Sequence, residues 1–199
     1  MFVLGLTGSL GMGKTTTARF FAEAGVPVHD ADAVVHRLYE GEAVLAIEAA
    51  FPGTTAGGKV DRGKLGARVL DDTAALRRLE AIVHPLVTQA EERFMAAARA
   101  AGAKIVVIDV PLLLEHGGDR RTDAVVVATA PADVQRARML ERPGMTPEKF
   151  AAILARQMPD AKKRERADFV VDTSQGLEAA RAQVQDILRA VATMPKRRR

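Results

Sequence analysis

The 199-residue chain is long enough to fold as one α/β domain with inserted subregions, but it is short for two full domains. It contains no Cys, which excludes disulfide scaffolds and cysteine nucleophiles, and it has no apolar run long enough to span a bilayer. Four of its 29 Lys and Arg are the last four residues, and the other 25 balance the 25 Asp and Glu, so the body of the chain is formally neutral and charge gives little support to nucleic-acid binding.

The first predicted strand, residues 2–7, is a short apolar run suited to a buried parallel strand. It begins directly after Met1, so we expect no signal peptide and a cytoplasmic protein. The stretch that follows, Gly8-Ser9-Leu10-Gly11-Met12-Gly13-Lys14-Thr15, matches the pattern G-x-x-x-x-G-K-[ST] without a mismatch. A helix is predicted next, over residues 16–22. The motif therefore has the strand and helix neighbours that it requires.

Each residue type in this loop suits a polyphosphate. Glycines let the backbone turn tightly, so that successive N–H groups converge on phosphate oxygens at the start of a helix. Lys14 would bring a positive charge to the β- and γ-phosphates, and the hydroxyl of Thr15 is a ligand for Mg²⁺. The segment predicts a bound nucleoside triphosphate.

A second strand is predicted over residues 26–30, with Pro27 favouring an edge strand or a strand start. Asp30 and Asp32 follow at the carboxyl end of this strand, where open parallel sheets bind ligands. Asp30 suits a helix N-cap. Asp32 is either a general base that accepts a hydroxyl proton or a charge that stabilises the helix dipole. A metal site made by Asp32 and His36 is disfavoured because no third ligand is evident.

A long helical insertion, residues 31–101, is predicted before the third strand. It comprises helices over 42–51, from Asp61 and over 73–101, with a loop over 52–58. A P-loop kinase would receive its second substrate there. Within it, the residues alone favour a kink at His84-Pro85 with a packed imidazole.

Residues 104–109 form the clearest buried strand, which ends in Asp109. This acid either helps to position Mg²⁺ through water or caps the next element. Further strands are predicted over 124–128 and 169–172, helices over 132–141 and 177–192, and a helix capped by Thr146.

The helices of residues 132–166 carry Arg136, Arg138 and Arg142, and we expect this region to close as an Arg-rich lid over the transferring phosphoryl group. Strands that alternate with helices predict an α/β P-loop NTPase fold, with a parallel five-stranded sheet and helices on both faces. The whole chain is predicted to be a single P-loop kinase domain with a basic tail over 193–199.

Five segments occur in a combination that is more specific than the P-loop alone. They are Gly5 to Thr15, Asp30-Ala31-Asp32, Val83-His84-Pro85-Leu86, Val110-Pro111-Leu112-Leu113-Leu114-Glu115, and Gln135 with Arg138 and Arg142. In order and spacing they resemble the dephospho-CoA kinase family, and the resemblance extends from about Phe2 to Asp172.

The resemblance implies transfer of the ATP γ-phosphate to the ribose 3′-hydroxyl of dephospho-CoA, the last step of coenzyme A biosynthesis, with Mg²⁺. Asp32 would then be the general base, with Lys14, Arg138 and Arg142 as catalytic cations. The ATP-binding residues would be Gly8, Gly11, Met12, Gly13, Lys14, Thr15 and Thr16, and the acceptor-binding residues Asp32, His84, Pro85, Leu112, Leu113 and Glu115.

One segment departs from the family pattern. The family often has Asn followed closely by Gly after the last strand, near the adenine, whereas this chain has Asp172-Thr173-Ser174-Gln175-Gly176. Adenine recognition by that loop is therefore left open. Two other functions also remain: another small-molecule kinase, such as a nucleoside monophosphate kinase, and a non-enzymatic nucleotide-dependent binding module that uses the basic tail. The sequence predicts no oligomeric state.

Overall fold

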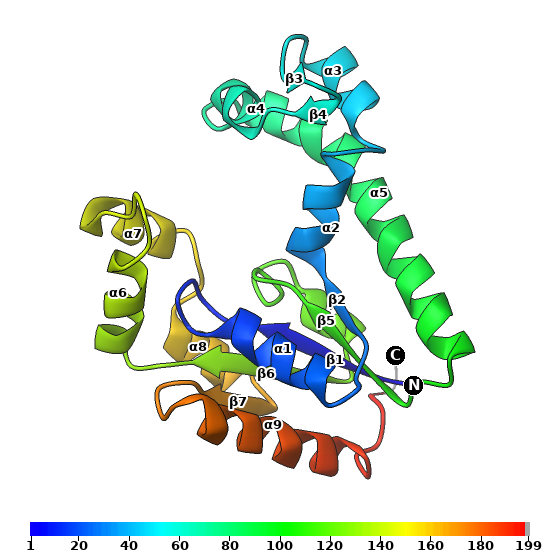
Figure 1. Cartoon of the computed structure of the whole chain (residues 1–199), viewed down its shortest axis with the longest axis vertical. Helices are drawn as coiled ribbons and strands as arrows, with labels where there is room; N and C mark the ends of the chain where they lie inside the picture. The colour runs from blue at the N-terminus through cyan, green and yellow to red at the C-terminus, as the bar shows by residue number, and fades with distance from the viewer. Residues whose placement is uncertain (198–199) are drawn as a thin grey trace. The chain divides into compact units, whose positions relative to one another are not determined.

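The computed structural model describes residues 1–197, which form two compact units (Figure 1). One unit contains residues 1–29 and the chain from residue 101 onward, and the other contains residues 30–100.

The first unit is built on a five-stranded sheet with the order β2-β5-β1-β6-β7. The strands are β1 (Phe2–Thr7), β2 (Val28–Asp30), β5 (Ile105–Asp109), β6 (Ala124–Thr129) and β7 (Phe169–Asp172). The pairings of β1 with β5, β1 with β6, and β6 with β7 are all parallel, which confirms the predicted fold class. β2 lies at an edge, as Pro27 predicted.

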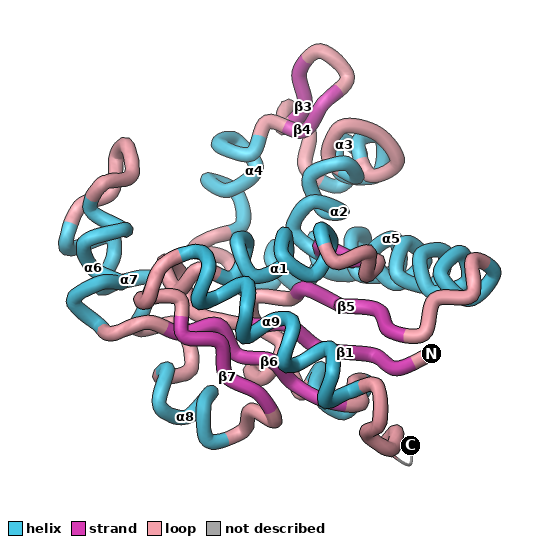
Figure 2. Tube along the Cα trace, turned by 60° about the horizontal axis from the view of Figure 1, so that its bottom comes forward, coloured by secondary structure: helices cyan, strands magenta, loops and turns pink. Residues whose placement is uncertain are grey.

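Helices α1 (Lys14–Glu23) and α9 (Leu177–Val191) pack on one face of this sheet, alongside the strands in Figure 2. Their contact is a core that includes Leu4, Leu6, Phe20, Phe21 and Val184, all at most 1% exposed. Because β1 and β6 are buried along their whole length, they are continuous apolar runs rather than alternating ones.

The other face of the sheet presents Val125 and Val127, which contact Leu113, Leu114 and Met158. The segment after β5 therefore covers this face, together with the chain around α8 (Asp160–Glu165). Helix α8 was not predicted from the sequence. The remaining elements of this unit are η1 (Gly118–Arg121), α6 (Ala132–Leu140) and α7 (Pro147–Leu154).

The second unit is helical, with its own apolar core. Its helices are α2 (Ala31–Leu38), α3 (Val44–Ala50), α4 (Arg62–Val69) and α5 (Thr73–Ala100). The predicted loop over 52–58 is wrong in part, because β3 (Thr55–Ala56) and β4 (Lys59–Val60) pair there as an antiparallel hairpin. α5 continues through Pro85.

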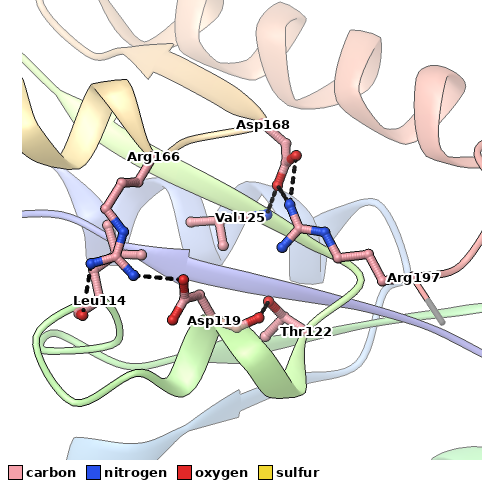
Figure 3. Close-up of polar contacts among 7 residues, drawn as sticks. All are labelled: Leu114, Asp119, Thr122, Val125, Arg166, Asp168 and Arg197. Atoms are coloured by element: carbon pink, nitrogen blue, oxygen red, sulfur yellow. Dashed lines mark hydrogen bonds and ion pairs between the residues drawn. The ribbon is translucent and has the colours of Figure 1, made fainter. Parts of the chain in front are cut away.

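The C-terminal segment contacts the amino-terminal edge of the sheet (Figure 3). Arg197 donates to both carboxylate oxygens of Asp168 at 2.8 Å, and Asp168 in turn accepts from the Val125 N–H at 2.8 Å. The predicted tail over 193–199 thus has one of its cations in an intramolecular ion pair, whereas Arg198 and Arg199 lie outside the described residues. Among residues 1–197, no helix has the length and apolar character needed to cross a membrane.

Candidate active site

The P-loop lies between β1 and α1, at the carboxyl edge of the sheet. Gly11 and Gly13 have φ values of 81° and 84°, the left-handed conformation that favours glycine. A Cβ atom on Gly13 would lie 2.8 Å from Oγ1 of Thr173, so close packing also excludes a larger residue there. α1 begins at Lys14, two residues before the predicted start, and no side chain caps it. Its first N–H groups therefore remain available to an anion.

Lys14 forms an ion pair with Asp109, with 2.7 Å between Nζ and Oδ1. The side chain of Asp109 is 2% exposed and that of Lys14 is 15% exposed. Neither role considered for Asp109, a Mg²⁺-positioning acid or a cap, anticipated this contact. The acid at the end of β5 holds the P-loop cation at the carboxyl edge of the sheet, where a phosphate group would compete for it.

The oxygen donors near the P-loop suit Mg²⁺, which prefers hard oxygen ligands and keeps several waters and phosphate oxygens. Thr15 presents an exposed hydroxyl in the first turn of α1, and Asp109 provides a carboxylate at the end of β5. Within residues 1–197 no group of three or more His, Cys, Asp or Glu gathers as a metal site. The hydroxyl of Thr15 and the carboxylate of Asp109 are oxygen ligands of the kind that Mg²⁺ prefers.

Arg138, one of the predicted lid cations, lies against the loop that follows β7. It donates to the Thr173 carbonyl at 2.6 Å and to the Thr173 hydroxyl at 2.8 Å, with a longer contact of 3.5 Å to the Gly11 carbonyl. Thr173 also donates to the Met12 carbonyl at 3.0 Å. Arg142 is exposed in the turn that follows α6. The structure thus brings Arg138, but not the side chain of Arg142, into contact with the P-loop.

The departure from the family pattern after β7 forms a defined turn. Asp172 accepts hydrogen bonds from the hydroxyl of Ser174 at 2.7 Å and from its N–H at 2.8 Å. These two bonds, the hydroxyl first, lower the pKa of Asp172 below its ordinary value. Thr173 and Asp172 therefore shape the loop by local and P-loop contacts.

The segment after β5 is attached to both the P-loop strand and α8. Thr7 donates its hydroxyl to the Pro111 carbonyl at 2.9 Å. Leu113 is 1% exposed and packs against the sheet residues Val125 and Val127, so its side chain anchors the segment that follows β5. Glu115 forms an ion pair of 2.9 Å with Lys163, whose side chain is fully buried.

Two opposing effects act on the pKa of Glu115. Burial raises it, but hydrogen bonds from Lys163 and from the Met158 N–H outweigh burial and leave the pKa below the ordinary value. Lys163 could not be singled out from the sequence, because nothing local distinguishes it from the exposed Lys162 beside it.

In the second unit, Asp30 caps α2 by accepting from the Ala33 N–H at 2.9 Å, which confirms its predicted role. Asp32 lies in the first turn of α2 with an exposed side chain. His84 and Pro85 are exposed on α5, so the packed imidazole considered from sequence is wrong. Asp32 and His84 are therefore both accessible to a substrate.

A parallel five-stranded sheet, a P-loop before α1 and a buried acid on the P-loop lysine define a nucleotide-binding protein of the P-loop kinase class. A solved structure of a protein from Thermus thermophilus has a TM-score of 0.87 and 30% identity, over 97% of this chain and 98% of its own. Shikimate kinase from Acinetobacter baumannii shares the fold, with a TM-score of 0.53 and 20% identity over 97% and 94% of the two chains.

The family model for dephospho-CoA kinase matches residues 2–179. Dephospho-CoA kinase from Rhodopseudomonas palustris is 66% identical over the full length of both chains. The enzyme of the same name from Mesorhizobium japonicum is 65% identical over 94% of this chain and 95% of its own. The chain belongs to the dephospho-CoA kinase family, a family of ATP-dependent kinases.

Proposed function

We propose that this protein transfers the γ-phosphoryl group of ATP to the ribose 3′-hydroxyl of dephospho-CoA, the last step of coenzyme A biosynthesis. Membership of the family supports the acceptor. The contact between Lys14 and Asp109 at the P-loop supports the phosphoryl transfer, because it keeps a cation at the place where the P-loop would bind phosphates. A cytoplasmic location stays a prediction.

In this proposal the nucleotide binds to the backbone of Gly8, Gly11, Met12 and Gly13, and to Lys14, Thr15 and Thr16. Met12 is 3% exposed, so it contributes its backbone rather than its side chain. Lys14 exchanges Asp109 for the β- and γ-phosphates. Mg²⁺, when bound by Thr15 and, through water, by Asp109, neutralises negative charge on the phosphates.

Asp32 is the proposed general base. The acceptor oxygen attacks the γ-phosphorus, its proton passes to Asp32, and the bond from the γ-phosphorus to the bridging oxygen breaks as ADP leaves. The exposure of Asp32, and the assignment of the capping role to Asp30, support this role.

The acceptor is proposed to contact His84 and Pro85 on α5 and the segment of Leu112, Leu113 and Glu115 after β5. Leu113 and Glu115 are engaged within the protein, so we expect them to shape that segment rather than to supply most of its contacts. Arg138 and Arg142 would add positive charge near the transferring group, as the Arg-rich lid predicts.

The experiment is an incubation of the purified protein with Mg·ATP and dephospho-CoA, followed by mass spectrometry that locates the new phosphate. A single phosphate on the ribose 3′-hydroxyl is expected. The absence of product with intact ATP binding would contradict the proposed acceptor, and phosphorylation within a panel of nucleoside monophosphates would favour the other small-molecule kinase.

Asp32→Asn tests the base, and Asp30→Asn is its matched control because Asn also caps helices. We expect Asp32→Asn to reduce kcat by about 10²–10⁴-fold with ATP affinity unchanged. Asp30→Asn should remain close to the original rate. Similar rates for the two variants would remove Asp32 from the role of base.

A further inference from the structure

A single P-loop residue, Leu10, is held on both of its backbone polar groups by two glutamines. Its N–H donates to Oε1 of Gln157 at 3.2 Å, and its carbonyl accepts from Nε2 of Gln135 at 2.6 Å. Gln135 lies on α6 and is 5% exposed, whereas Gln157 follows α7 and is half-buried. Two segments far apart from Leu10 in sequence thus hold the two successive peptide groups of the phosphate-binding loop that flank this residue.

The chemistry of the two amides is complementary. A backbone N–H only donates, so it takes the carbonyl oxygen of Gln157, and a backbone carbonyl only accepts, so it takes the NH₂ group of Gln135. Neither contact depends on the side chain of Leu10. The pair therefore fixes the orientation of the backbone itself.

The next two carbonyls of the loop also accept from side chains. The Gly11 carbonyl accepts from Arg138 at 3.5 Å, and the Met12 carbonyl accepts from Thr173 at 3.0 Å. In a trans peptide the carbonyl and the following N–H point in opposite directions. Donors that hold the carbonyls of residues 10 and 12 therefore direct the N–H groups of Gly11 and Gly13 to the opposite side.

We propose that Gln135 and Gln157 are positioning residues for nucleotide binding. Gln135 holds the Leu10–Gly11 peptide so that the Gly11 N–H faces the phosphates, and Gln157 holds the Ser9–Leu10 peptide that precedes it. Together they couple the shape of the P-loop to α6 and to the turn after α7. This inference rests on the proposed function only for the nucleotide, since it requires no particular acceptor.

The test uses the same substitution at both positions. Gln157→Glu keeps an oxygen that accepts from the Leu10 N–H, whereas Gln135→Glu replaces a donor with a carboxylate that faces a carbonyl. Both variants add one negative charge, so the difference between them isolates the lost donor. The readout is the Kd of the β,γ-imido analogue of ATP with Mg²⁺, measured by calorimetry without acceptor.

We expect the Kd of Gln135→Glu to exceed that of Gln157→Glu by about tenfold. Gln135→Glu leaves the buried Leu10 carbonyl without a donor, which is costly, whereas Gln157→Glu keeps the hydrogen bond from the Leu10 N–H. Gln135→Leu and Gln157→Leu, which each lose one bond, should raise the Kd about threefold to tenfold. In turnover assays, the KM for ATP should rise while the KM for the acceptor is unchanged. Residues with a merely structural role would not raise the KM for ATP while leaving the KM for the acceptor unchanged.

Gln185→Leu and Gln185→Glu on the exposed face of α9 are the controls and should bind as the original protein does. Equal Kd values for Gln135→Glu and Gln157→Glu, or a normal Kd in both Leu variants, would overturn the proposal. If the buried Gln135 variants do not fold, the test is the Kd of Gln157→Leu compared with that of Gln157→Glu. The proposal requires the Leu variant to bind the analogue more weakly, and equal Kd values would overturn it. A protein that binds the analogue but does not phosphorylate dephospho-CoA would refute the proposed acceptor alone.

Discussion

Lys163→Met tests the buried ion pair behind the segment that follows β5. The amino group of Lys163 lies 2.9 Å from Oε1 of Glu115, and the Lys163 side chain is 0% exposed. Met has a similar length and no charge. The variant therefore keeps most of the packing and leaves the Glu115 carboxylate with the Met158 N–H and without its cation.

Breaking a buried ion pair by removing one partner costs about 3–5 kcal/mol. The Glu115 side chain keeps 14% exposure and one backbone donor, so we expect the lower end, about 3 kcal/mol. A chain of this length loses about 2–4 °C in Tm per kcal/mol. The Tm of Lys163→Met should therefore be lower than that of the original protein by about 6–12 °C.

The assay is thermal and urea unfolding at neutral pH, with Lys162→Met as the matched control. Lys162 also pairs with a carboxylate at 2.9 Å, that of Glu165, but the two side chains are 65% and 61% exposed. Its loss should cost less than about 0.5 kcal/mol.

A double variant, Lys163→Met with Glu115→Leu, should recover most of the lost stability, because apolar residues often replace a buried pair at little cost. About 1 kcal/mol should remain lost, since the Met158 N–H no longer has its acceptor. The reasoning is refuted if Lys163→Met is as stable as Lys162→Met, or if the double variant is less stable than Lys163→Met.

Three further predictions follow from the described contacts. Glu115→Gln should destabilise the protein at neutral pH, because the lowered pKa of the Glu115 carboxyl stabilises the fold while the group is ionised. The difference should shrink as the pH falls below the ordinary range of a carboxyl group and through the lower pKa of the folded state, and unfolding free energies that stay parallel with pH would contradict this. Gly13→Ala should weaken both nucleotide binding and the stability of the fold, because φ is 84° and the new Cβ would lie 2.8 Å from Thr173. The backbone conformation alone should cost about 1–2 kcal/mol. A Kd and an unfolding free energy equal to those of the original protein would refute this prediction. Arg197→Gln should lower the Tm slightly, by the loss of about 0.5–1 kcal/mol from a half-exposed ion pair in which one guanidinium nitrogen contacts both oxygens of Asp168. It should leave kcat unchanged, and a change in kcat without a change in Tm would argue against a purely structural contact.

Several elements were predictable because their causes are local. The caps by Asp30, Asp61 and Thr146 follow from a side-chain oxygen close in sequence to the N–H that it accepts from. The buried strands were found because their apolar runs are continuous. Other local features were missed: the hairpin over residues 55–60 has no apolar alternation, and α8 is only six residues long.

The sequence by itself determined the P-loop, because a glycine pattern with its lysine and hydroxyl is a contiguous segment whose chemistry does not depend on distant residues. The alternation of strands and helices determined the parallel α/β fold, and the combination of five segments indicated the family. Only the tertiary structure decided which distant groups meet that segment. It placed Asp109 on Lys14, buried Lys163 against Glu115 while leaving Lys162 in solvent, and brought two glutamines to the N–H and the carbonyl of Leu10. These contacts form where strand ends and helices meet in the folded structure. Because the residues are far apart in the sequence, their spacing does not predict that they will be neighbours.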